Sequence, residues 1–490
     1  MKTHDYSRRV LWIFVFVILI LLVLPHFLVN KTPDEENFGA TISLLYCIPF
    51  LGMLLSIALF PLFKPHFWEK NMFVVSIFWG LCFLIPFAIL QGPHLAGSQF
   101  YQIMMLDFLP FIVLLWGLFA VSGGIVLKGA LSGSPKVNLI LLIAGTLLAS
   151  WIGTTGASVL MIRPLLRANA WREKKAHVVI FFIFLVSNIG GGLTPIGDPP
   201  LFLGFLRGVP FFWTMRLAPL LLFNAAILLV VFFIIDRRLY RKDVEAGRKP
   251  PETGENEPLR VEGLHNLVFL AMIVGAVILS GMLGTLKGFE DPATGQTIVA
   301  PLPGDSGLPV NIIIQMIIIL FAGLLSLKTT KKEIHDLNNF SWGPIKEVAM
   351  VFCGIFVTMI PALAILHTRG AGLGLTEPWQ YFWASGALSS FLDNAPTYLV
   401  FMTTAASLGT QGVMTSVGSI APSLLLAVSA GSVFMGANTY IGNAPNFMVR
   451  CIAEDHGVKM PSFFGYMRWS GLILIPLFVL NTIVFFAINS

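Results

Sequence analysis

Charged residues are scarce in this chain: Asp, Glu, Lys and Arg make up 11% of its 490 residues, against about 25% in ordinary soluble domains. Cysteine is scarce too, and the four cysteines show neither a disulfide pattern nor the spacing of a zinc site. The chain also lacks a nucleotide-binding loop and a nucleophile elbow. We therefore expect no enzyme and no resident cofactor. No nucleic-acid partner is expected either, because the basic residues lie in short loops between apolar runs.

Long apolar runs are abundant. Hydrophobic residues make up 56% of the chain, and the mean hydropathy is +0.82. Since about 20 apolar residues span a bilayer, the sequence predicts an all-α polytopic membrane protein with about 11 transmembrane helices in contact with lipid. The predicted spans are 11–29, 40–63, 72–91, 108–128, 176–205, 213–236, 264–285, 310–327, 345–368, 418–449 and 466–488. The first span lacks a signal-peptide cleavage site, so a retained helix is expected.

Two further apolar stretches, about 137–168 and 378–408, are interrupted by polar clusters and are predicted to be re-entrant hairpins. Without the first span, each half of the chain then contains five spans and one hairpin. An odd number of spans inverts the second half relative to the first, which is the inverted-repeat plan of many carriers. The expected parts are an N-terminal helix and external loop at 1–39, a first repeat at 40–236, a cytoplasmic linker at 237–263 and a second repeat at 264–490.

The basic residues predict the orientation of the chain. If the N-terminus is cytoplasmic and both hairpins return to the side they entered from, all but five of the 31 Lys and Arg residues are cytoplasmic. The exceptions are Lys31, Arg207, Arg216, Lys287 and Arg369. Cytoplasmic loops carry such an excess of Lys and Arg. We expect an integral protein of the plasma (bacterial inner) membrane with a cytoplasmic N-terminus and an external C-terminus.

One sequence occurs twice inside the apolar stretches. Residues 194–202 read TPIGDPPLF, and residues 439–447 read TYIGNAPNF. Each copy lies in a long span, 176–205 or 418–449, where glycine and proline disfavour a regular helix. The residues expected to break the helices are Gly190, Gly191, Gly192, Gly197, Pro199, Pro200, Pro396, Gly442 and Pro445. Interruptions in corresponding places of two halves indicate the central binding site of a secondary transporter.

Polar side chains gather at these interruptions and at the two hairpin tips, TTGAS at 154–158 and DNAPT at 393–397. Asp198 is the acidic residue of the first interruption, Asn443 replaces it in the second, and Asp393 is the acidic residue of the second tip. Backbone and side-chain oxygens of this kind replace the water shell of a hard cation such as Na⁺. The expected cation, proton or substrate ligands, and Na⁺ ligands if a metal binds, are Asp198, Asp393, Asn394, Asn188, Ser187, Thr194, Thr154, Thr155, Ser158, Thr397, Asn438, Thr439 and Asn443.

The carboxylates suggest a mechanism of exchange. Loss of water favours the protonated form of a carboxyl group, and a bound cation favours its ionised form, so a cation and a proton compete for one site. Matching the hairpin tips places Thr155 opposite Asn394 and Ser158 opposite Thr397. These polar groups would then surround the carboxylates near the middle of the membrane.

Other interpretations of the acidic residues remain open. Asp198 directly precedes Pro199 and Pro200, and it therefore also fits the N-cap of a helix that resumes there. Asp107 and Asp236 lie at the edges of predicted spans, where we expect water to reach them.

Two motifs carry a resemblance to a known superfamily. The run GGLTPIGDPP at 191–200 and DNAP at 393–396 resemble signatures of the ion-transporter superfamily, most of all its NhaD-type sodium/proton antiporters and arsenite exporters. The sequence around Asp198 is also similar to that of citrate-transporter-like (CitMHS-like) carriers. Two departures are the TTGAS tip, where many relatives have an Asn, and Leu201 after the paired prolines. The resemblance covers roughly residues 40–488 and implies eleven spans, two hairpins and a homodimer.

Two functions follow from these observations. The first is sodium/proton antiport, in which Na⁺ and H⁺ alternate at carboxylates near the membrane midplane. It is favoured because no basic residue is expected there, so an anionic substrate would be repelled by Asp198 and Asp393. The alternative is transport of citrate or another carboxylate together with cations, with helix N-termini and amides holding the anion.

Overall fold

The computed structural model describes residues 38–129, 131–248, 260–283, 299–301, 307–338 and 340–487. Its helices are α2 (Ile48–Phe63), α3 (Pro65–Gln91), α4 (Pro93–Gln102), α5 (Leu109–Ser122), α6 (Pro135–Ile152), α7 (Thr154–Ala168), α8 (Ala176–Leu185), α9 (Pro199–Leu206), α10 (Ala218–Glu245), α11 (Asn266–Leu283), α12 (Val310–Thr329), α13 (Lys332–Leu337), α14 (Gly343–Arg369), α15 (Pro378–Phe391), α16 (Asn394–Ala406), α17 (Pro422–Phe434), α18 (Ala444–Asp455) and α19 (Phe463–Asn481). The antiparallel strand pairs are β1 (Val126–Lys128) with β2 (Arg260–Glu262), β3 (Val299–Pro301) with β4 (Gly307–Pro309), and β5 (Val413–Thr415) with β6 (Gly418–Ile420). The predicted span 11–29 lies outside the described residues.

Ten helical stretches of the described residues are long and apolar enough to cross a membrane. This confirms the predicted class, an all-α polytopic membrane protein. One member of the set differs from the prediction. The first hairpin arm, Pro135–Ile152, is long enough to span, whereas the stretch 418–449 is divided: β6 ends at Ile420 and the helix that follows it covers only Pro422–Phe434.

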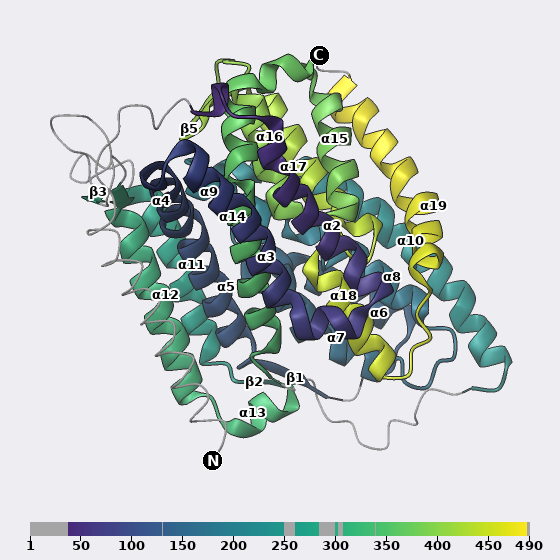
Figure 1. Cartoon of the computed structure of the whole chain (residues 1–490). Coiled ribbons are helices and arrows are strands. Elements are labelled where there is room, and N and C mark those ends of the chain that lie inside the picture. Colours follow the sequence, from purple (N-terminus) through teal and green to yellow (C-terminus); the bar gives the residue numbers. More distant parts are fainter. Residues whose placement is uncertain are drawn as a thin grey trace.

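The same helix pairings occur in both halves of the chain. α2 packs on α3 as α11 packs on α12, and α3 packs on α14 as α12 packs on α5. The arms of the first hairpin, α6 and α7, pack on each other, as do α15 and α16 of the second. In Figure 1, α11 and α12 lie at one edge of the molecule, and α10 and α19 lie at the other.

The interrupted spans interlock the two halves. α9 of the first half packs on α16 of the second, and α18 of the second half packs on α7 of the first. The interrupted stretch Ala176–Leu193 is central, since 89% of its most apolar window is buried, against 28% for Pro65–Gln91 of α3. The residues of one half therefore complete the surroundings of the other half at the middle of the molecule.

Small structures mark the two ends of the bundle. β1, β2 and α13 lie together at one end, and β5 lies at the other (Figure 1); we name these the β1–β2 end and the β5–β6 end. The predicted span 108–128 is wrong at its C-terminal boundary, because α5 ends at Ser122 and residues 126–128 form a strand. Side chains of Asn266 and Asn338 donate to the carbonyl oxygens of residues 123–125, which satisfies the end of α5.

A buried ionic cluster extends α10 beyond its predicted boundary. The helix continues through residues 237–245, which the sequence assigns to the linker. Arg172 lies 2.5 Å from Asp236 and 3.3 Å from Asp243, and His177 lies 2.8 Å from the same oxygen of Asp236. All four side chains are buried. The expectation that water reaches Asp236 is therefore wrong, because the carboxylate turns inward to a guanidinium.

Candidate functional site

Two interrupted spans form the centre of the site. In the first, α8 ends at Leu185, a 3₁₀ helix covers Ile189–Leu193, and α9 begins at Pro199. In the second, a 3₁₀ helix covers Met435–Asn438 and α18 begins at Ala444. The backbone between these helices cannot continue the regular hydrogen-bond ladder, so its polar groups need other partners.

The expected helix-breaking residues divide into two kinds. Gly190, Gly191 and Gly192 lie in the first 3₁₀ helix, and Gly197 and Gly442 lie in the irregular backbone after each 3₁₀ helix. The prolines begin helices instead, where a missing N–H is harmless. They are the first two residues of α9 (Pro199 and Pro200), the second of α18 (Pro445) and the third of α16 (Pro396).

Glycine is required where the interrupted backbone approaches itself. A Cβ atom at Gly197 would overlap the backbone of Gly191, and one at Gly442 would overlap the carbonyl oxygens of Gly436 and Ser389. Both halves thus fold the chain after the 3₁₀ helix back onto its start. This close approach holds the residue after each glycine, Asp198 or Asn443, at the middle of the bundle.

Each interrupted span is fastened to the first arm of its own hairpin by a threonine. Thr194 Oγ1 donates to the carbonyl oxygen of Ser150, and Thr439 Oγ1 donates to the carbonyl oxygen of Ser390. The Ser150 hydroxyl in turn donates to the carbonyl oxygen of Gly190. Thr194 and Thr439, two of the predicted ligands, thus use their hydroxyl protons to hold the unwound backbone in place.

Asp198 is the point at which four elements meet. Its carboxylate accepts hydrogen bonds from Thr154 Oγ1 at 2.8 Å, from Asn443 Nδ2 at 3.2 Å and from Asn394 Nδ2 at 2.5 Å. Thr154 and Asn394 begin the second arms of the two hairpins, and Asn443 precedes α18. The residue is 1% exposed. Asp198 occupies the N-cap position of α9, but its side chain makes no capping hydrogen bond there, so the capping interpretation does not describe it.

The hairpin tips align one residue differently from the sequence match. Thr154 and Asn394 are each the first residue of their helix and each donates to Asp198. The structure thus pairs Asn394 with Thr154 rather than with Thr155, and Gly153 (φ 79°) takes the place that Asp393 has in the other tip. The sequence match failed because the residues that precede the two helices, Gly153 and Asp393, are different.

Asp393 has the role that the sequence allowed for Asp198. Its carboxylate accepts from the backbone N–H of Ala395 at 3.1 Å and so caps α16. Its side chain is half-buried, and Thr397 donates to its carbonyl oxygen at 2.9 Å. The two acidic residues are therefore not equivalent: one caps a helix, and the other gathers side chains from both halves.

A ladder of amides and hydroxyls surrounds Asp198. Asn443 also donates to the carbonyl oxygen of Ser187 at 3.1 Å, and Asn188 donates to Asn446 Oδ1 at 2.7 Å. The hydroxyls of Ser158 and Ser187 lie 2.9 Å apart. The sequence also places Asn446 among the polar groups of the second interruption, but it does not place Ser150 or Ser390 among the site residues, although each is a serine one turn before a hairpin tip.

Two amide oxygens near the site have no hydrogen-bond partner. Asn394 Oδ1 is buried beside Asp198, and Asn438 Oδ1 is buried near Ser390, whose hydroxyl accepts from Asn438 Nδ2 at 2.9 Å. Leaving a buried acceptor without a partner costs about 1–3 kcal/mol. An ion or a water molecule at these oxygens would remove that cost.

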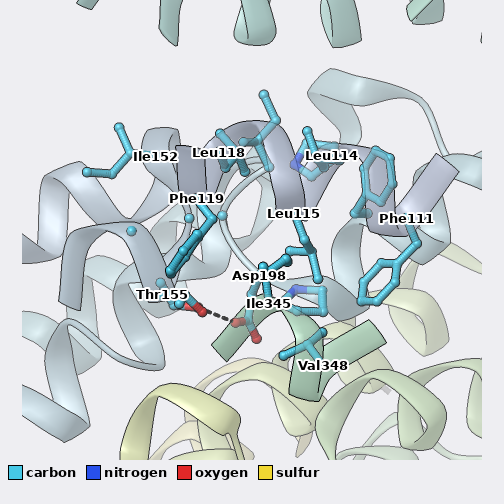
Figure 2. A pocket seen from close by; sticks show the side chains of 18 of the residues that line it. Phe111, Leu114, Leu115, Leu118, Phe119, Ile152, Thr155, Asp198, Ile345 and Val348 are labelled. Carbon is cyan, nitrogen blue, oxygen red and sulfur yellow. Dashed lines mark hydrogen bonds between the residues drawn. The ribbon is translucent and has the colours of Figure 1, made fainter. Parts of the chain in front are cut away.

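A cavity of about 60 Å³ adjoins Asp198. Thr155, in the tip of the first hairpin, lines it. Figure 2 shows Asp198 among apolar side chains such as Leu115, Phe119 and Ile345. The cavity walls contain no Lys or Arg. Since one water needs roughly 10–15 Å³ of such space, the cavity has room for a few water molecules beside the carboxylate.

The donor set indicates which ions the site fits. No group of three or more His, Cys, Asp or Glu residues that could hold a metal occurs in the part of the chain that the structure describes. The groups near Asp198 are one carboxylate, amides and hydroxyls. Such oxygen ligands suit a hard cation, whereas transition metals prefer imidazole or thiolate.

These features define an integral membrane protein of the secondary-transporter class, with interrupted spans meeting at a central polar site. A family model described as "Putative citrate transport" matches residues 39–486, so the chain belongs to that family. A search of curated proteins gave no match to the chain.

Proposed function

We propose that the protein exchanges a small monovalent cation, Na⁺ or Li⁺, for protons, with Asp198 as the shared site. The observation that supports this most is the composition of the surroundings of Asp198. Its hydrogen-bond donors, Thr154, Asn394 and Asn443, are all neutral. A buried carboxylate without a cationic partner is costly unless it takes up a proton or a cation.

The neutral donors allow both loaded forms. With a proton on Asp198, the amides of Asn394 and Asn443 remain hydrogen-bonded around a neutral acid. With a cation bound, rotation of the Asn394 amide would turn its unpartnered Oδ1 toward the ion. The Thr154 hydroxyl is both a donor and an acceptor, so it serves in either form. Because each form excludes the other, uptake of one ion releases the other.

The cavity favours a small cation over a large anion. Its volume of about 60 Å³ is far below the several hundred Å³ usual for organic ligands, and no basic residue lines it. A citrate ion placed here would face Asp198 across a site of low dielectric, where like charges repel strongly.

A second candidate function is transport of citrate or another carboxylate coupled to cations. The family description favours it directly. In that case a cation bound at Asp198 would offset the repulsion, and the helix N-termini that meet at the site would orient the anion.

Everted membrane vesicles with a trapped pH dye test the proposal. Added Na⁺ or Li⁺ should move protons in vesicles that contain the protein, and Asp198→Asn should remove this response. Vesicles that accumulate labelled citrate but show no ion-dependent proton movement would reject cation exchange and favour the second candidate.

We also propose the arrangement of the chain in the membrane. The pairings that recur in both halves support inverted repeats at 40–236 and 264–490, and the distribution of basic residues supports a cytoplasmic N-terminus in a bacterial inner membrane. A homodimer is proposed from the superfamily resemblance and is testable by light scattering in detergent.

A further inference from the structure

An ion pair that the proposed exchange does not use joins α9 to the segment before α5. Arg207 Nη2 lies 2.7 Å from Asp107 Oδ2. The side chain of Asp107 is 4% exposed and that of Arg207 is 21% exposed. The expectation that water reaches Asp107 is therefore wrong, because the chain folds a guanidinium over the carboxylate.

This pair is connected to the site through one short helix. Asp198 directly precedes α9 and Arg207 directly follows it, and α9 has eight residues, which span about 12 Å. The far end of α9 lies at the β5–β6 end, because the carbonyl oxygen of Arg207 accepts from the backbone N–H of Ser416 at 2.7 Å. Any displacement of Asp198 along this direction must also move Arg207.

Asp107 belongs to a different group of helices. It lies in the π-helix Ile103–Phe108, between α4 and α5. π-Helical turns are rare in proteins, and those that occur often lie at functional sites. α5 packs most on α11 and α12 at the edge of the molecule, whereas α9 packs most on the second hairpin and touches α5 and the π-helix more lightly. The ion pair thus joins the helix that carries Asp198 to the helices at that edge.

The cavity extends along α5 beside Asp198. Its walls run from Phe111 in the first turn of α5 to Leu118 and Phe119 near the last turn, and they reach Pro344 and Ile345 in the first turn of α14. The last turn of α5 leads directly to β1, so the cavity reaches toward the β1–β2 end (Figure 1). The open space beside Asp198 thus extends to the first turn of α14 at the β1–β2 end, whereas the ion pair lies at the β5–β6 end of α9.

We propose that the Asp107–Arg207 ion pair is a latch that closes the β5–β6 side of the site and opens once in each transport cycle. This inference rests on the proposed function, in which Asp198 holds the transported ion. Separating two buried charges is costly unless water enters between them. Opening of the site to the β5–β6 side would admit that water, and closing would expel it. The pair therefore favours the state with access from the β1–β2 side.

The test measures access to the cavity and needs no transported ion. The native cysteines Cys47, Cys82, Cys353 and Cys451 are replaced by serine. Val348→Cys then reports on the cavity, because Val348 is half-buried and lines it. In detergent, a methanethiosulfonate reagent should label Val348→Cys about tenfold more slowly in the neutral double variant Asp107→Asn/Arg207→Gln. The rate should fall because, without the ion pair, the state with access from the β1–β2 side is less populated. Unchanged or faster labelling overturns the proposal, because a merely structural ion pair would loosen the site when removed.

Two matched variants complete the experiment. The exchanged pair Asp107→Arg/Arg207→Asp should restore the original labelling rate, and failure to restore it in a monodisperse protein rejects the latch. The double variant Lys128→Gln/Glu262→Gln removes an ion pair of 2.9 Å at the β1–β2 end and should leave labelling unchanged. If the neutral latch variant does not fold, Arg207→Lys keeps the charge, weakens the contact and should slow labelling in the same direction.

The labelling result and the proposed function can fail separately. Proton exchange that survives Asp198→Asn rejects the shared cation site, whatever the labelling rates are. Labelling rates that ignore the ion pair reject the latch, even where Asp198→Asn abolishes exchange.

Discussion

Asp198 and Asp393 show how the same residue type takes different roles in two related places. Asp198 accepts from three side chains on three other elements, and Asp393 accepts from the backbone of its own helix. The difference arises from the residues after them. Asp393 accepts from the N–H of Ala395, the second residue of α16, whereas the second residue of α9 is Pro200, which has no N–H to offer Asp198.

This contrast predicts unequal effects of neutralising the two residues. Asp198→Asn keeps the size of the side chain but cannot bind or release a proton, so ion-driven proton exchange in vesicles should fall to that of vesicles without the protein. In Asp393→Asn, ion-driven proton exchange should fall by at most about fivefold, because Asn caps helices about as well as Asp. Equal losses in both variants would contradict the different roles.

The buried cluster around Arg172 is predicted to dominate local stability. Arg172→Gln leaves Asp236 and Asp243 buried without their guanidinium, and breaking such a pair costs about 3–5 kcal/mol. Lys128→Gln removes one partner of the exposed pair with Glu262, which is worth about 0–1 kcal/mol. Thermal unfolding in detergent, followed by tryptophan fluorescence, should show a clearly lower midpoint for the first variant alone. Similar midpoints would indicate that the cluster is hydrated.

At the scale of the elements, the sequence predicted the helix interruptions because the same motif occurs in both halves of the chain. The doubled Thr-x-Ile-Gly motif predicted two interruptions, and the structure has irregular backbone at both. Hydropathy could not show that α10 continues past Asp236, because Asp236 is buried against Arg172, which is 64 residues distant in sequence. Ser390 was missed as a site residue because its partners, Met435 and Asn438, lie on the interrupted span, and only its match with Ser150 before the first tip signals it.

The interruptions also predict where a single methyl group is not tolerated. Gly197→Ala would push its Cβ into the backbone of Gly191, and backbone has no flexible end that could move aside. The variant should lose proton exchange and fold in lower yield. Gly275→Ala in α11 is the control, since nothing lies within 4 Å of the added atom and alanine favours a helix by up to about 1 kcal/mol. Exchange measured at equal protein amounts distinguishes them, and full activity of Gly197→Ala would show that the close approach is unimportant.

At the scale of the whole molecule, the two halves meet through like pairs. Asn224 of α10 and Asn481 of α19 exchange amide hydrogen bonds at 3.2 and 3.0 Å, and both are fully buried. Each is in the last long helix of its half. Together with the exchange of α9 and α18 between hairpins, this pair is what two repeats related by an axis in the membrane plane would produce.

The proposed inverted repeats predict that matching loops lie on opposite sides of the membrane. Lys332 begins α13 at the β1–β2 end in the second half, and its match in the first half is Gln91, which ends α3 next to α4 at the β5–β6 end (Figure 1); both residues are exposed. In right-side-out vesicles, a membrane-impermeant maleimide should label Gln91→Cys at once and Lys332→Cys only after the membrane is permeabilised, because the excess of Lys and Arg places the β1–β2 end in the cytoplasm. Everted vesicles should give the reverse order. Labelling of both positions from one side would reject the inversion of the second half. A reversed order in both preparations would keep the inversion and reverse the orientation, and the β5–β6 latch would then face the cytoplasm.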